Sequence, residues 1–141
     1  MLTERRLWIT YIEVDQHEME NNKMKEQNQL LSILSHEYSY NFDTLRANRV
    51  VASFYKYGSV KANFSTGNVN ALATMEKCVE KYNETGNTEY LCDAANYLMF
   101  EFMYPQHPKA HFEATDSNGS AGIVGLSEKE IEEFRKENDW K

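Results

Sequence analysis

Apolar residues recur with the period of a helix between Thr88 and Tyr104, and this is the clearest run of its kind in the chain. They fall at i, i+3, i+4, i+7, i+8 and i+11, the pattern of a helix that packs against other helices. These positions are Leu91, Ala94, Ala95, Leu98, Met99 and Phe102. Further aromatic residues and methionines leave little of the circumference polar. The pattern predicts a helix in the middle of the core.

Three further helical segments are predicted within the first 57 residues. Residues 2–14 fit a helix about as well as a short strand, and helix is favoured because good helix formers are present and no turn residue interrupts them. Residues 18–38 are expected to form a helix whose apolar face lies near its C-terminal end. Asp43 is expected to be the N-cap of the third helix, which stops before Gly58.

The third helix is expected to bury its apolar residues and to leave Arg46 and Arg49 outside the buried face. The expected buried residues are Leu45, Val50, Val51, Phe54 and Tyr55. Residues 59–68 predict a loop with one short turn of helix, and residues 69–83 predict a fourth helix. Because only residues 84–87 connect that helix to the core helix, the two are expected to be antiparallel neighbours.

Pro105 and Pro108 end the core helix, because each removes a backbone donor and restricts the residue before it. Residues 105–125 are therefore expected to form a loop rich in Gly, Ser and Thr. Loops of this length in compact domains tend to be functional or disordered. The residues expected to pin the loop to the body are Phe112, Ile123 and Val124.

Ser127, followed three residues later by Glu130, has the spacing of a capping box and predicts a last helix over residues 127–139. Together with a helical core over residues 43–104, this predicts an all-α fold. The expected architecture is an antiparallel helical bundle with a long Pro- and Gly-containing loop and a capped C-terminal helix. A length of 141 residues predicts a single domain over residues 1–141.

Composition narrows the functional classes. The net charge of −7 disfavours a protein that binds the phosphate backbone of nucleic acids, because such proteins present a basic patch. No apolar run approaches the roughly 18 residues of a membrane span. The N-terminal residues lack the apolar segment of a secretion signal, so a cytoplasmic location is expected. Cys78 and Cys92 have no metal-ligand spacing and are expected to be reduced core thiols, with a disulfide as the alternative.

The core helix carries three polar residues that are candidates for a site. At about 100° per residue, Glu89, Asp93 and Asn96 come to lie one above the next on the helix surface. We name these three residues the polar strip. A buried carboxylate needs a partner, so the strip is expected to face a cation, a ligand, a basic side chain or water.

Two interpretations of the polar strip follow. Carboxylates at i and i+4, here Glu89 and Asp93, can share one Mg²⁺ or Mn²⁺ ion, which then bridges to substrate phosphates. In the alternative, the strip is satisfied by a basic residue of the preceding helix. The basic residues available there are Arg46, Arg49 and Lys56.

Other polar groups are weaker candidates. Glu76 and Glu80 repeat the i, i+4 spacing, but lysines interleave with them and a solvated face is the expected role. The loop after the core helix contains a further set of metal-ligand residue types, His107, His111, Glu113 and Asp116. Pro108 prevents the two histidines from sharing a helix face, so this loop is expected to contact a ligand or a partner chain and not zinc.

Three short motifs resemble a known family. Lys56-Tyr57-Gly58, Asn70-Ala71-Leu72 and the segment from Glu89 to Tyr97, which ends in Asp-Ala-Ala-Asn-Tyr, are similar to small phage and bacterial proteins related to MazG, the all-α nucleoside triphosphate pyrophosphohydrolases. The resemblance covers about residues 45–104. It implies a dimeric helical bundle that holds Mg²⁺ and a nucleotide between its helices.

On this resemblance, Glu89 and Asp93 match the metal-binding acids, and Asn96 would touch the base or the sugar. The chain departs from the family on the preceding core helix, where the family has paired acids and residues 43–57 contain only Asp43. Hydrolysis of a phosphoanhydride needs metal ions to neutralise charge and activate water. The missing acids are therefore expected to affect catalysis and not nucleotide binding. The tail of the chain is also similar to small phage proteins.

Three functions remain open. The first is a phage-type protein of a bacterial host's cytoplasm that binds a nucleotide or nucleotide-like defence signal and sequesters it, without catalysis and as a homo-oligomer. The second is a Mg²⁺-dependent nucleoside triphosphate pyrophosphohydrolase. The third is an acidic protein–protein inhibitor of a host defence complex. For the first, the expected ligand-binding residues are the polar strip together with Arg46, Arg49, Lys56, Lys61, His107, His111 and Asp116.

Overall fold

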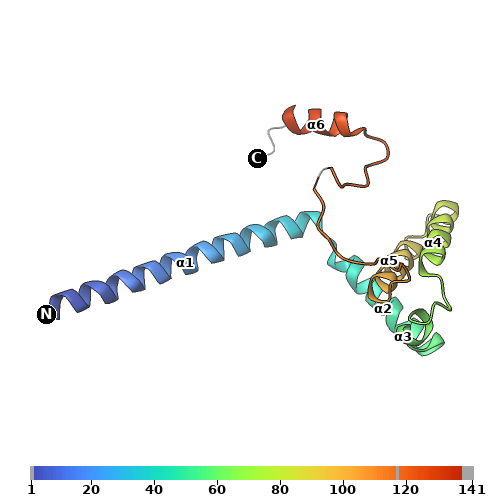
Figure 1. Cartoon of the computed structure of the whole chain (residues 1–141), viewed down its shortest axis with the longest axis horizontal. Coiled ribbons are helices and arrows are strands. Elements are labelled where there is room, and N and C mark those ends of the chain that lie inside the picture. The colour runs from blue at the N-terminus through green and yellow to red at the C-terminus, as the bar shows by residue number, and fades with distance from the viewer. Residues whose placement is uncertain (1, 117, 138–141) are drawn as a thin grey trace. The chain divides into compact units, whose positions relative to one another are not determined.

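The computed structural model describes residues 2–116 and 118–137, and the side chains of 15–116, 118–133 and 135–137. All regular secondary structure in the described residues is helical, which confirms the predicted all-α fold. Figure 1 shows α2, α3, α4 and α5 gathered together. The helices are α1 (Leu2–Glu37), α2 (Tyr40–Tyr57), α3 (Val60–Phe64), α4 (Ala71–Thr85), α5 (Glu89–Met103) and α6 (Glu128–Glu137).

The chain divides into two compact units. The first unit is Met1–Gln106 and the second is His107–Lys141. In the first unit, α5 packs against α4, α2 and α3. In the second unit, α6 is the regular element among the described residues. We describe each unit by itself.

The N-terminal segment forms one continuous helix, α1, where the sequence left helix or strand open for residues 2–14 and predicted a separate helix over 18–38. The first glycine of the chain is Gly58 and its first proline is Pro105. With no such residue to interrupt it, helical backbone continues through the polar stretch as well. Every described side chain of α1, from residue 15 to residue 37, is exposed.

The N-cap residue of α2 differs from the predicted one. Ser39, and not Asp43, is the N-cap, because its hydroxyl oxygen accepts a hydrogen bond from the N–H of Phe42 at 3.0 Å. Asp43 lies in the first turn, where it accepts hydrogen bonds from the Tyr38 hydroxyl and from Arg46. These two donors, the tyrosine first, lower the pKa of the Asp43 carboxyl. At the other end, the predicted stop at Gly58 is confirmed, with φ of 86°.

The connection between α4 and α5 has the predicted form. Asn70 caps α4 through a hydrogen bond from the N–H of Ala73 to Asn70 Oδ1, 3.0 Å long. Gly86 follows α4 with φ of 70° and ψ of 7°, a left-handed conformation that glycine adopts without steric cost. Only residues 86–88 separate the two helices, which places α4 and α5 antiparallel and side by side.

The core of the first unit is small and centred on Phe64 and Phe100. Their ring centroids are 4.8 Å apart, and Tyr97 lies 5.9 Å from Phe100 in an edge-to-face arrangement. Ala71 completes the buried cluster. Cys78 and Cys92 are buried and free, as predicted, and burial raises the pKa of the Cys78 thiol.

The predicted core stripe of α5 is wrong at two of its positions. Leu98 and Phe102 are exposed, whereas Phe100, one of the further aromatic residues that widen the predicted stripe, is buried. The buried residues of α5 are Cys92, Ala94, Asn96 and Phe100. Three of them, at i, i+4 and i+8, form a narrow line of small and aromatic side chains along the helix. An all-round apolar helix does not reveal from its own sequence which side its neighbours will cover.

The predicted buried face of α2 is wrong at four of its five positions. Val50 is partly buried and packs against the core cluster, as predicted, whereas Leu45 is exposed. Val51, Phe54 and Tyr55 are also exposed, and we name these three residues the outer face of α2. Arg46 and Arg49, expected on the outside, are partly buried and reach α5. The physical reason is the acidic strip on α5, because two carboxylates beside the core require a cationic partner.

The second unit contains the predicted capping box. Glu130 N–H donates to Ser127 Oγ at 3.2 Å, and Ser127 N–H donates to Glu130 Oε2 at 2.7 Å. These hydrogen bonds, the one from the Ser127 backbone first, lower the pKa of the Glu130 carboxyl. Phe112, Ile123 and Val124 are exposed, contrary to the expectation that they pin the loop. The predicted end of the last helix, at 138 and 139, lies outside the described residues.

Candidate functional site

The polar strip of α5 faces α2, where one arginine binds both of its carboxylates. Arg49 Nε and Nη2 donate to the two oxygens of Asp93, each at 2.9 Å, in a bidentate ion pair. Arg49 Nη1 lies 3.0 Å from Glu89 Oε1. The expected alternative, a basic residue of the preceding helix, is therefore what the structure has at this position.

The ion pair lies at the edge of the core, not at its centre. The Asp93 side chain is 21% exposed and those of Arg49 and Glu89 are 41% and 53% exposed. The Asp93 hydrogen bonds, and to a lesser extent the charges of Asp93 and Glu89, raise the pKa of the Arg49 guanidinium. A guanidinium between two carboxylates stays charged at any physiological pH, so this contact does not act as a pH switch.

Asn96, the third member of the polar strip, is 5% exposed and is the one buried polar residue among the described side chains. Its Nδ2 group donates to the backbone carbonyl of Arg46 at 2.9 Å, a third link between α5 and α2. Asn96 Oδ1 is buried without a hydrogen-bond partner in the described structure. Its enclosure leaves it no surface on which a base or sugar could dock.

The other predicted phosphate-binding residues of the first unit have local partners. Arg46 Nε donates to Asp43 Oδ1 at 3.0 Å, and its Nη1 lies 3.5 Å from the sulfur of Met99. Lys56 Nζ lies 5.0 Å from the centroid of the Tyr57 ring, a cation–π contact. Lys61 is exposed on α3. Arg46 and Lys56 thus have contacts within the first unit.

A divalent ion does not fit the strip as it is arranged. Glu89 and Asp93 would have to turn their oxygens to one Mg²⁺ ion, but the Arg49 guanidinium already holds an oxygen of each. Among the described residues, no group of three or more His, Cys, Asp or Glu side chains has metal-binding geometry. The two carboxylates are arranged for an arginine and not for a divalent ion.

His107, His111 and Asp116 lie in the second unit. His107 Nδ1 accepts a hydrogen bond from the N–H of Lys109 at 3.0 Å, and His111 Nε2 lies 3.5 Å from Glu113 Oε2. These contacts join residues two apart in the sequence and only shape the loop. Neither histidine converges with the other on a common point in the described contacts.

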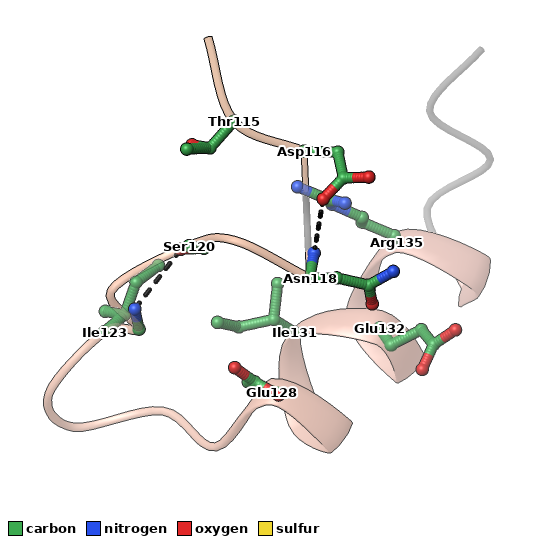
Figure 2. A pocket seen from close by; sticks show the side chains of 10 residues that line it. Thr115, Asp116, Asn118, Ser120, Ile123, Glu128, Ile131, Glu132 and Arg135 are labelled. Carbon is green, nitrogen blue, oxygen red and sulfur yellow. Dashed lines mark hydrogen bonds between the residues drawn. The ribbon is translucent and has the colours of Figure 1, made fainter. Parts of the chain in front are cut away.

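Asp116 lines an open cavity of about 660 Å³ in the second unit. Asp116 Oδ1 accepts from the N–H groups of Asn118 and Gly119, at 3.0 and 3.2 Å, so the carboxylate closes a turn of the chain (Figure 2). Glu128 and Glu132 also line the cavity, but their carboxylates point apart (Figure 2). The cavity thus has a polar lining without a focused set of donors or acceptors.

The feature that sequence reasoning did not predict is the exposure of the outer face of α2. The spacing of its apolar residues in the sequence predicted a buried face. In the folded chain, however, Val51, Phe54 and Tyr55 are each more than half exposed. The Phe54 and Tyr55 rings contact each other edge to face at 5.7 Å. The apolar spacing and the exposure within the first unit together give α2 an apolar surface.

Comparisons add no further assignment. No described helix is long and apolar enough to span a membrane. No protein-family model, curated protein or solved structure matches this chain.

Proposed function

We propose that this chain is a non-enzymatic protein that acts by binding another protein through an apolar surface; it shares the protein partner of the third function suggested by the sequence, but not its acidic binding surface. The observation that supports the proposal is the outer face of α2, where Val51, Phe54 and Tyr55 form a continuous apolar stripe at i, i+3 and i+4. Tyr55 is 84% exposed. Large exposed apolar side chains on one helix face are typical of protein-binding surfaces.

The chemistry of the face specifies the kind of partner. Phe54 and Tyr55 are rigid aromatic side chains, the class that contributes most to binding energy at protein interfaces. Exposed Leu98 and Phe102 on α5 provide further apolar surface of the same character. The partner is therefore expected to offer an apolar groove or an apolar helix face. The acidic residues of α6 would influence the rate of encounter more than the affinity.

The closed state of the polar strip favours this function over the two nucleotide-based ones. In both of those, Glu89 and Asp93 must be available to a metal ion or ligand, whereas here Arg49 binds both carboxylates. No specific contact of the described residues favours a bound nucleotide. Sequestration of a nucleotide and hydrolysis of a nucleoside triphosphate remain predictions of the sequence alone.

A charge placed on the outer face of α2 is expected to abolish binding. Val51→Glu introduces a carboxylate that the partner's apolar surface would have to desolvate, and we expect the dissociation constant to rise at least tenfold, about 1.4 kcal/mol. The matched control is Val79→Glu, the same change at an exposed valine of α4. The partner is captured from a bacterial lysate with the unchanged chain, identified by mass spectrometry and then titrated with all three proteins.

The result separates specific docking from nonspecific adhesion. The proposal requires that Val79→Glu keeps the affinity of the unchanged chain while Val51→Glu loses it, with equal helix content in both. Equal affinities for all three proteins would show that the outer face of α2 is not the binding surface.

A further inference from the structure

We draw no further inference here: the strongest candidate, the set of exposed apolar side chains near the C-terminal end of α1 (Leu30, Leu31, Ile33 and Leu34), carries none because nothing in the structure shows what covers it.

Discussion

Phe100→Ala is expected to lower the free energy of unfolding by about 3 to 5 kcal/mol, while Phe102→Ala on the same helix lowers it by less than about 1 kcal/mol. Phe100 is 6% exposed and packs between Phe64 and Tyr97, whereas Phe102 is 75% exposed. Removing the buried ring loses its transfer free energy and leaves a cavity. Removing the exposed ring loses little transfer free energy and leaves no cavity.

The pair of phenylalanine variants is a sharp test because the two residues are alike in everything except burial. The buried cluster of the first unit contains few residues, so a loss of this size is a large part of the stability of a single domain. Urea unfolding followed by circular dichroism, at one fixed protein concentration, measures both variants. Equal losses for the two variants, or a larger loss for Phe102→Ala, would support the core stripe predicted from the sequence instead.

Arg49→Met is expected to destabilise the first unit by about 1 to 3 kcal/mol, a range reduced for the partial exposure of the ion pair. The change leaves Asp93, which is 21% exposed, and Glu89 without their shared cation. Methionine keeps much of the length and apolar contact of the arginine stem, so the loss reports mainly on the charge contact. Lys81→Met is the control, because the Lys81–Glu84 pair is exposed and lies within one helix.

A double-mutant cycle assigns the effect to the contact between α2 and α5. The variants are Arg49→Met, Asp93→Leu and the two together, and the expected coupling free energy is about 1 kcal/mol or more. The sign of the change in unfolding free energy caused by Asp93→Asn is also informative. If the carboxylate supports the fold, removing its charge destabilises the protein. If the carboxylate is held for a ligand, the same substitution stabilises the protein or leaves its stability unchanged. Unfolding free energies that add without coupling would contradict the assigned role of Arg49.

Local signals in the sequence predicted the ends of several helices. Gly58 and Gly86 stop α2 and α4 because a positive φ after the last turn suits glycine. The Ser127 capping box begins α6 because both of its hydrogen bonds lie within four residues. Such features need no information from distant parts of the chain.

The choice of buried face was not predictable in the same way. On α2, apolar residues occupy one side and arginines another, and burial would ordinarily follow the apolar side. Asp93, 44 residues after Arg49, reverses this order by binding its guanidinium. A choice of buried face that depends on a partner helix cannot be read from the periodicity of the helix itself.

The central claim is that Arg49 satisfies the carboxylates of the polar strip, so that the strip is not an open cation site. Paramagnetic broadening of backbone amide signals during a Mn²⁺ titration tests this claim most directly. We predict that the amides of Glu89, Asp93 and Asn96 broaden no more than those of the acidic helix α6. Selective broadening of the polar strip at low Mn²⁺ concentration, removed by Asp93→Asn, would show an open cation site and contradict the account.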